Sequence, residues 1–83
     1  MKKKINPNSF EFSARLEIDY LNRKYELNLP QDENYETLGG LIFHVTGEIP
    51  KKNTIFSINN IEIKVVSVLS NKIEKVAVKK VIN

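Results

Sequence analysis

The sequence predicts an α+β domain, in which two short helices pack against one face of a small antiparallel sheet. Apolar residues in the first half of the chain recur with helical spacing, and the second half holds β-branched runs joined by short polar turns. The predicted order is therefore β-α-α-β-β-β. With 83 residues the chain forms one domain, and a chain of this size buries about 60 to 65% of the surface that it exposes when unfolded.

The first segment, MKKKINPN, is polar, contains a proline and shows no hydrophobic period. We therefore expect residues 1–8 to form a flexible lead-in or the end of a linker, and the domain itself to span residues 9–81. A short strand, FEFSA, is predicted to follow from about Phe10.

Two short amphipathic helices come next. The segment RLEIDYLNRKYELNLP has the i, i+3, i+4, i+7 spacing of one helical face, and Pro30 prevents this helix from continuing. The segment YETLGGLIFHVTGEIP repeats the spacing in a second apolar stripe. The first face consists of Ile18, Leu21, Asn22 and Tyr25, and the second of Leu38, Leu41, Ile42 and Val45.

The second helix has clear signals at both ends. Thr37 is a good N-cap residue, Gly47 occupies the position where a left-handed residue ends a helix, and Pro50 follows it. Gly39 and Gly40 need a reason, because glycine weakens a helix by about 1 kcal/mol relative to alanine. In the first turn they cost less, and we expect their missing side chains to let another backbone pack close.

The segments TIFSI, IEIKVVSVL and IEKVAVKKV predict an antiparallel meander. Its turns are the pair Asn59-Asn60 and the segment SNK. Apolar residues keep one phase as far as Val65, and Val66 starts the other phase. This switch predicts a bulge, or a strand that is apolar on both faces.

The composition, 41% hydrophobic and 28% charged, is that of a soluble globular domain, and no apolar run is long enough to span a membrane. The absence of cysteine excludes a disulfide framework and thiolate metal sites. The net charge of +3 is unevenly distributed: residues 1–10 carry +3, residues 11–48 carry −5 (three basic, eight acidic) and residues 49–83 carry +5 (seven basic, two acidic). The acidic and basic halves either complement each other within the fold or face different partners.

The sequence offers little for catalysis, and we predict that the chain is not an enzyme. His44, the one histidine, lies near the edge of the apolar stripe of the second helix, where we expect a boundary residue rather than a ligand or base. One histidine without cysteine supplies neither a zinc set nor a Cys-His pair. No serine is marked as a nucleophile elbow among Ser9, Ser13, Ser57, Ser67 and Ser70.

Two further segments have features of a binding site. Asp32, Glu33 and Glu36 either favour the positive end of the second helix dipole or hold a hard cation, and they lack the spacing of a calcium loop. The segment LGGL lacks the spacing of a phosphate-binding loop, so close packing is the preferred interpretation. We predict no catalytic, cofactor-binding or metal-binding residue, and no cofactor.

Lysines suggest a third kind of site, for nucleic acid or anionic lipid. They occur as Lys2 to Lys4, Lys51-Lys52 and Lys79-Lys80. Nucleic-acid-binding surfaces commonly combine basic residues with exposed aromatic ones, and the second half of the chain holds one aromatic residue, Phe56. We therefore do not expect nucleic acid as a partner.

The chain resembles the transporter-associated domain of the CorC/HlyC type over roughly residues 10 to 80. The supporting positions are Asn22, Leu29, Pro30, Tyr35, Thr37, Leu38, Gly40, Leu41, Gly47, Ile49, Pro50 and Ile73. The departures are mild: Asn53-Thr54 replaces a common Gly-Asp, and the hairpins carry Asn59-Asn60 and Ser70-Asn71 where glycine is frequent. Asparagine tolerates positive φ better than most residues, so we expect these turns to survive.

The resemblance implies the same β-α-α-β-β-β fold, related to part of the flavin-binding (FAD-binding-domain-like) fold, and no catalytic residues. It also implies a regulatory domain of a Mg²⁺ or Co²⁺ transporter or hemolysin-like protein, on the cytoplasmic side of the membrane. The expected partners are the CBS-domain pair and the CNNM-type transmembrane region of the same longer protein, and a second copy of the domain. The alternatives are a sensor of a nucleotide or flavin fragment and, more weakly, a basic nucleic-acid-binding module.

Overall fold

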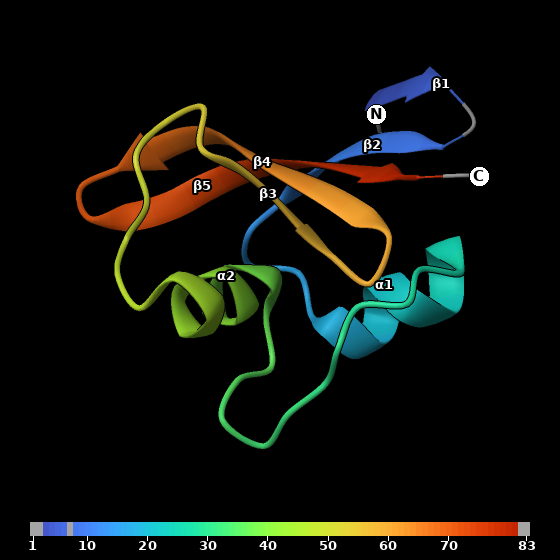
Figure 1. The fold of residues 1–83 in the computed structure, drawn as a ribbon, viewed down its shortest axis with the longest axis horizontal. Coiled ribbons are helices and arrows are strands. Elements are labelled where there is room, and N and C mark those ends of the chain that lie inside the picture. Colours follow the sequence, from blue (N-terminus) through green and yellow to red (C-terminus); the bar gives the residue numbers. More distant parts are fainter. Residues whose placement is uncertain (1–2, 7, 82–83) are drawn as a thin grey trace.

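The computed structural model describes residues 3–6 and 8–81, and the side chains of residues 8–81. It contains two helices and five strands (Figure 1). In chain order these are β1 (Lys3–Asn6), β2 (Ser9–Ser13), α1 (Ile18–Tyr25), α2 (Leu38–Thr46), β3 (Ile55–Ile58), β4 (Ile61–Leu69) and β5 (Lys72–Lys80). The predicted α+β fold, with its β-α-α-β-β-β order from β2 to β5, is confirmed.

The strands form one antiparallel sheet in the order β1-β2-β5-β4-β3. Both helices lie on the same side of this sheet (Figure 1). β2 pairs with β5, the last strand in the sequence, because the two helices carry the chain away before the meander returns. The opposite side of the sheet carries no helix in the part of the chain that the structure describes.

The core lies between the sheet and the helices. Alternate residues of the three central strands face it, as expected for strands with one covered face. The helices contribute their predicted stripes, and Leu27 and Leu29 of the following segment complete the layer. From the strands the core receives Phe10, Phe12, Ile61, Ile63, Val65, Ile73, Val76 and Val78.

One residue of the predicted stripes, Val45, is exposed, and two others, Asn22 and Tyr25, are half-buried. Leu38, Leu41 and Ile42 are fully buried, whereas Val45 is 49% exposed. Val45 lies on the same face of α2, one turn after Leu41, so its helical position is as predicted. The prediction was wrong about its burial, because the helix pattern gives the direction of a side chain and not how far the covering sheet extends.

The segment predicted as a flexible lead-in also differs in part. Lys3–Asn6 is strand β1, which pairs with β2 and shows a register shift between Lys4 and Asn6. Met1, Lys2 and Pro7 lie outside the described residues. The sequence MKKKINPN has no alternation of apolar and polar residues, so its pattern does not predict a strand. An edge strand can nevertheless form through backbone pairing without burying an apolar face.

The phase switch in β4 is a bulge, as predicted. Val65 pairs with Val76, but the next pair joins Ser67 to Lys75, so Val66 is the extra residue. One step later Val68 pairs with Ile73, which leaves Glu74 as the extra residue on β5 and restores the register. The two irregularities compensate, and both long strands therefore continue to the hairpin tip.

The asparagine turns adopt the backbone that their sequence allows. Asn59 and Asn60 have φ of 48° and 65°, and Ser70 and Asn71 have φ of 48° and 68°. Positive φ at both central residues is the requirement of the two-residue hairpin turn that matches strand twist. Asn53, which replaces a common glycine, also has a positive φ of 73°.

Candidate functional site

The starts of the two helices are joined by backbone hydrogen bonds. The N–H of Ile18 donates to the carbonyl of Glu36 at 2.8 Å, and the N–H of Leu38 donates to the carbonyl of Leu16 at 2.9 Å. Glu17 and Thr37, the N-cap residues, form an antiparallel bridge between these bonds. The entry to α2 is therefore held against the segment that follows β2.

This junction explains the two glycines. The N–H of Gly39 donates to the carbonyl of Ala14 at 2.9 Å, and a Cβ on Gly39 would lie 3.2 Å from that oxygen and from the Ala14 Cβ. A Cβ on Gly40 would lie 3.0 Å from the Cβ of Tyr35. The predicted close approach at the helix start is confirmed.

The same bonds leave no free N–H at the start of α2 for a phosphate group. Leu38 and Gly39 donate to backbone carbonyls, Gly40 donates to Oγ1 of Thr37 at 3.1 Å, and Leu41 donates to the Thr37 carbonyl. Anion sites at helix starts depend on donors without protein partners. LGGL is therefore a packing motif here, as its sequence suggested.

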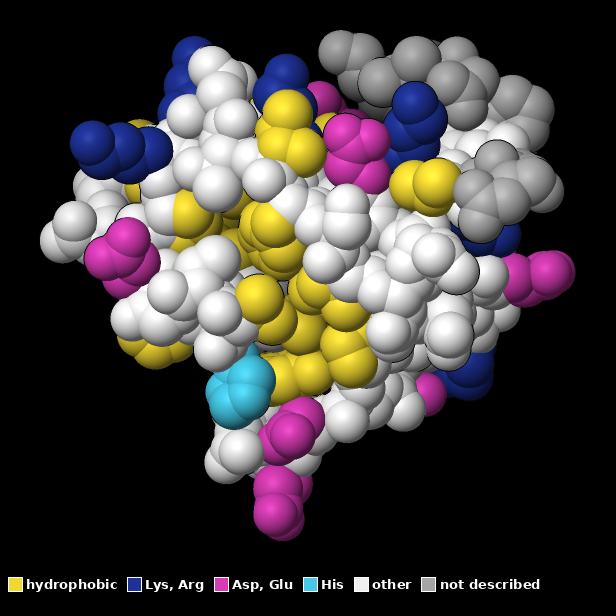
Figure 2. Space-filling view, viewed as in Figure 1, with side chains coloured by type: hydrophobic (Ala, Val, Ile, Leu, Met, Phe, Trp, Pro, Cys, Tyr) yellow, Lys and Arg dark blue, Asp and Glu magenta, His cyan; other side chains and the backbone are white. Residues whose placement is uncertain are grey.

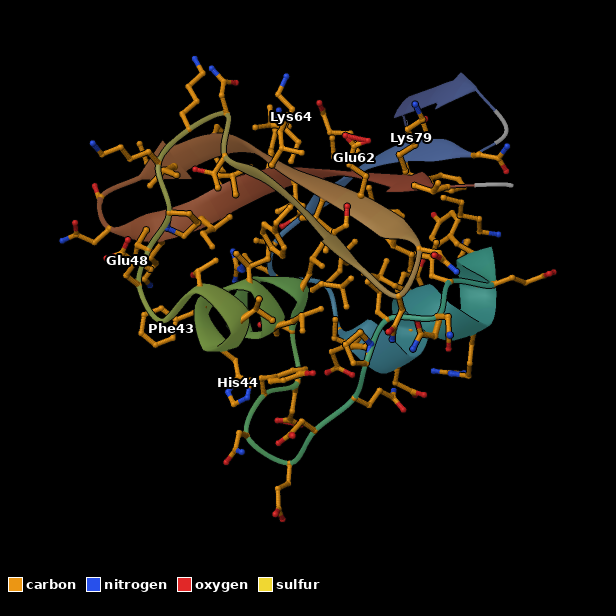
Figure 3. All side chains as sticks on the ribbon, viewed as in Figure 1. Phe43, His44, Glu48, Glu62, Lys64 and Lys79 are labelled. Carbon is orange, nitrogen blue, oxygen red and sulfur yellow. The ribbon has the colours of Figure 1, made fainter. Side chains whose placement is uncertain are left out.

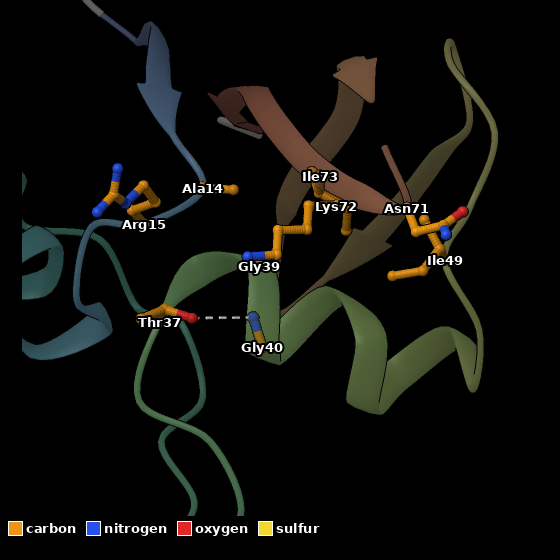
Figure 4. A pocket seen from close by; sticks show the side chains of 9 residues that line it. All are labelled: Ala14, Arg15, Thr37, Gly39, Gly40, Ile49, Asn71, Lys72 and Ile73. Carbon is orange, nitrogen blue, oxygen red and sulfur yellow. Dashed lines mark hydrogen bonds between the residues drawn. The ribbon is translucent and has the colours of Figure 1, made fainter. Parts of the chain in front are cut away.

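A hollow of about 400 Å³ lies beside this junction (Figure 4). Arg15 and Ile49 lie at its two ends, and Lys72 extends from the start of β5 toward α2 (Figure 4). A second hollow, of about 380 Å³, shares Arg15, Lys72 and Ile73 with the first and continues along β5. We call the two together the Arg15–Lys72 surface; its members are Ser13, Ala14, Arg15, Thr37, Gly39, Gly40, Ile49, Leu69, Asn71, Lys72, Ile73, Glu74 and Lys75.

The Arg15–Lys72 surface combines exposed apolar side chains with positive charge. Leu69, at the end of β4, is 61% exposed, and Ile49 is 38% exposed. Arg15, Lys72 and Lys75 line the same hollow as Leu69, with one acidic residue, Glu74, whose carboxylate accepts a hydrogen bond from the hydroxyl of Ser67. Such a surface suits an acidic partner with an apolar anchor better than it suits chemistry.

The acidic residues before α2 lie at the far end of the molecule from the sheet, where Figure 2 shows acidic side chains at the lower tip. The first turn of α2 itself contains no acidic residue. Asp32 forms a turn of its own, in which Oδ1 accepts from the N–H of Asn34 at 2.8 Å. Asp32 and Glu36 line a hollow of about 170 Å³ with Glu17 and Asp19. Within residues 8–81, however, no group of three or more His, Asp or Glu side chains is placed to hold a metal ion.

Tyr35 closes this loop. Its hydroxyl donates to the carbonyl of Pro30 at 2.8 Å, and its ring lies 5.3 Å from the ring of His44. Burial, with a contribution from the negative charge of Asp32, raises the pKa of the Tyr35 hydroxyl above its ordinary value. The tyrosine therefore remains a neutral donor to Pro30 well into the alkaline range.

The remaining candidates are scattered. His44 is exposed on α2 and projects away from the sheet, as Phe43 does (Figure 3). The serines considered as nucleophiles lie on strands β2, β3 and β4 and at the β4–β5 hairpin tip, whereas His44 lies on α2. Lys79 and Lys64 project from the sheet on the side away from the helices, with Glu62 directly opposite Lys79 (Figure 3).

The acidic and basic halves of the sequence are not joined by ion pairs in the part of the chain that is described. The ion pair found there links Arg23 to Asp19 at 3.2 Å, both within α1. Figure 2 shows lysine and arginine along the upper margin of the molecule, where the sheet lies, with apolar side chains gathered in the middle of the face. Acidic side chains also lie among the basic ones in the upper part of this view, so the structure does not decide between the two interpretations of the charge division.

Residues 3–82 match the family of the transporter associated domain, CorC_HlyC. The chain belongs to this family. It is 30% identical over 78 residues to a "Possible hemolysin C" of Rickettsia canadensis (strain McKiel), an alignment that covers 93% of this chain and 26% of that protein. The domain therefore spans about a quarter of the length of this relative.

Solved structures show the same fold for the transporter-associated domain. The region associated with the CorC Mg²⁺ and Co²⁺ transporter of Neisseria meningitidis MC58 superposes with a TM-score of 0.85 at 18% identity, covering 96% of this chain and 98% of that one. The transporter associated domain of a CBS domain protein from Porphyromonas gingivalis gives 0.80 at 15% identity, with 98% of both chains covered. At these identities the likeness establishes the fold alone.

The structure explains why several residues of the resemblance are what they are. Thr37 caps α2, Gly40 makes room for Tyr35, and Tyr35 binds the carbonyl of Pro30. Gly47 ends the helix with a φ of 77° and donates its N–H to the carbonyl of Phe43 at 2.8 Å. Sequence reasoning did not find the Arg15–Lys72 surface, because its parts come from four separate segments of the chain: 13–15, 37–40, 49 and 69–75. Across the described residues, neither helix has the length and apolar character to cross a membrane.

Proposed function

We propose that this transporter-associated domain is a non-enzymatic regulatory module of a membrane protein that transports divalent cations such as Mg²⁺ or Co²⁺. It acts on the cytoplasmic side, by contact with a CBS-domain pair and transmembrane region of the same longer protein, or with a second copy of itself. The relative from Rickettsia canadensis, about four times as long as the matched region, supports a place within a longer chain.

The Arg15–Lys72 surface is the observation that carries this proposal. It offers exposed apolar area between basic side chains, and its backbone is anchored by the junction of the two helices. A surface of this kind recognises a neighbouring protein through shape and charge, with no need for reacting groups. We infer that the neighbour presents carboxylates opposite Arg15 and Lys72 and an apolar side chain beside Leu69.

Regulation by contact requires that the domain bind two states of its neighbour with different affinity. A tenfold difference corresponds to about 1.4 kcal/mol, which the loss of one or two charge contacts at a partly desolvated surface can supply. The anchored helix junction matters here, since a rigid surface loses less entropy on binding than a mobile one.

The direct test is deletion of residues 9–81 from the parent protein, with cation transport and assembly measured. A change in either supports the proposal, whereas unchanged transport and assembly would refute it. A finer variant is Lys72→Glu, which reverses charge on the Arg15–Lys72 surface. Its matched control is Lys51→Glu, an exposed lysine of the α2–β3 loop that lies outside both hollows.

A ligand sensor is the second candidate, favoured by the size of the larger hollow. About 400 Å³ is within the range of about 300 to 1,000 Å³ that small-molecule sites occupy. Thermal melting of the isolated domain with Mg²⁺, Co²⁺, adenine nucleotides and flavins distinguishes the two functions. A ligand at a hundredfold excess over its dissociation constant stabilises by about 2.7 kcal/mol, and no shift with any compound would leave protein contact as the mechanism.

A further inference from the structure

Strand β3 ends the sheet with unpaired backbone groups. The N–H of Val65 donates to the carbonyl of Thr54 at 2.9 Å, in register with the β3–β4 pairs. Hydrogen-bonded pairs alternate along an antiparallel ladder, so Phe56 and Ile58 use their N–H and carbonyl groups toward β4. The corresponding groups of Ile55 and Ser57 point outward from the sheet.

Apart from its shortness, four residues, β3 has none of the usual protections of an edge strand. Its sequence, Ile-Phe-Ser-Ile, has no charge and no proline, and Ile55 is 55% exposed. The other edge strand, β1, has a register shift between Lys4 and Asn6, and such an irregularity is one of the usual devices against edge pairing. One edge of the sheet is therefore protected and the other is open.

We propose that β3 pairs antiparallel with β3 of a second copy of this chain, across a two-fold axis at Phe56. The inference rests on the proposed contact with a second copy and identifies the surface used. In this register Ile55 lies opposite Ser57 of the second copy and exchanges both backbone hydrogen bonds with it. All the outward N–H and carbonyl groups of Ile55 and Ser57 are then satisfied, and the two sheets become one.

The side chains are compatible with this symmetry. Phe56 faces the helix side, where it packs half-buried against the core, so the two Phe56 rings meet across the axis. Ile55 meets Ser57 on the other side, and neither is charged. In this two-fold interface only Phe56, on the axis, meets its own symmetry mate, and Ile55 and Ser57 meet each other twice. Because none of these residues is charged, no like-charge contact arises between the paired strands.

The charged residues of β4 that lie beside Ile55 and Ser57 add weak charge complementarity between the two copies. Lys64 pairs with Ile55, and Glu62 pairs with Ser57. Across the joint, the row of Lys64 and Ile55 therefore continues into Ser57 and Glu62 of the second copy. Lysine at one end of the row and glutamate at the other favour this register over one that would align like charges.

The proposed interface is small. A four-residue strand buries less than the roughly 1,200 Å² of total area that stable dimers need. We therefore expect the isolated domain to dimerise weakly, with a dissociation constant of about 1 mM. A longer protein that holds two copies together provides an effective concentration in the same range. Such affinity makes the contact reversible, as a regulatory contact must be.

The test uses the isolated chain at concentrations from about 10 μM to about 1 mM, with sedimentation equilibrium and amide NMR. We expect a rising apparent mass, together with concentration-dependent shifts and slower exchange of the Ile55 and Ser57 amides. A monomer across the whole range, or a dimer in which these two amides are unaffected, would overturn the proposal. The regulatory role is tested separately by transport, so its failure and this one are distinguishable.

Ser57→Pro sharpens the test. It removes one outward N–H and leaves the β3–β4 ladder intact, because the Ser57 N–H takes no part in that ladder. We expect Ser57→Pro to weaken dimerisation at least tenfold while Ser57→Ala, which keeps the N–H, retains it. Equal dimerisation of both variants would contradict the pairing, and should Ser57→Pro fail to fold, the wild-type amide shifts still decide.

Discussion

Asn22 clamps the first helix to the segment that leaves it. Its Oδ1 accepts from the N–H of Leu29 at 3.0 Å, and its Nδ2 donates to the carbonyl of Leu29 at 3.0 Å. The side chain thus completes both backbone groups of a residue whose own side chain is buried in the core. We predict that Asn22→Ala strongly destabilises the domain.

The magnitude follows from the two groups that lose their partner. An unsatisfied buried donor or acceptor costs about 1 to 3 kcal/mol, and the Asn22–Leu29 bonds are only partly buried, which favours the lower end. A total of about 2 to 3 kcal/mol results. The whole domain, at about 0.05 to 0.15 kcal/mol per residue, is stable by about 4 to 12 kcal/mol, so the loss is a large fraction.

Urea unfolding and thermal melting measure this directly. With about 4 to 8 °C lost per kcal/mol in a domain of this size, the melting temperature of Asn22→Ala should fall by about 10 to 20 °C. Asn22→Asp keeps the acceptor and should lose less. The matched control is Asn28→Ala, an exposed asparagine whose backbone carbonyl still accepts from Asn59; if Asn22→Ala lost no more than this control, the clamp would be unimportant.

Three further predictions concern the backbone and pH. Gly39→Ala should destabilise the domain despite the better helix propensity of alanine, because the new Cβ would lie 3.2 Å from the backbone oxygen of Ala14. The control, His44→Ala on the exposed face of the same helix, should not destabilise it, and urea unfolding curves of the two variants compare their stabilities. Asn53→Gly should be neutral and Asn53→Ala should cost about 1 kcal/mol, because φ is positive there; equal stabilities would refute this. Because the pKa of Tyr35 is raised in the folded protein, its ionisation opposes folding. Its contribution to the free energy of unfolding is therefore complete below the ordinary tyrosine pKa, near 10, and is lost as the pH rises through the raised value. Tyr35→Phe should therefore show a shallower loss of stability above about pH 10, and parallel pH curves for the two proteins would contradict it.

The elements of this domain were predictable where local rules and burial agree. The helical stripe at Leu38 and Leu41, the cap at Thr37 and the bulge at Val66 follow from spacing and residue type. The exposure of Val45 and the strand at residues 3–6 could not be predicted in this way. The first depends on how far the sheet covers α2, and the second depends on backbone pairing with β2. A single sequence predicts the direction in which a side chain points better than it predicts which segments will surround that side chain.

The surfaces of the domain were less predictable than its core for the same reason. Sequence reasoning assigned Gly39 and Gly40 a packing role, and the structure identifies Ala14, at the end of the predicted strand FEFSA, as the partner of Gly39. Arg15, beside it, becomes part of the Arg15–Lys72 surface only because the β4–β5 hairpin returns to the start of α2. Neither residue belongs to a motif, so no pattern could have identified them.

The arrangement of the sheet connects the two proposed contacts. The Arg15–Lys72 surface lies at the β4–β5 hairpin and the start of α2, whereas the open edge is formed by β3, beyond β4. The lining residues of the two hollows include none of β3, so a second copy on that edge leaves the basic surface accessible. The two proposed contacts therefore use different residues of the domain and do not exclude each other. Both contacts require shaped surfaces and no reacting group, which agrees with a fold in which Thr37 caps a helix, Asn59 and Asn60 form a turn and Gly39 allows close packing.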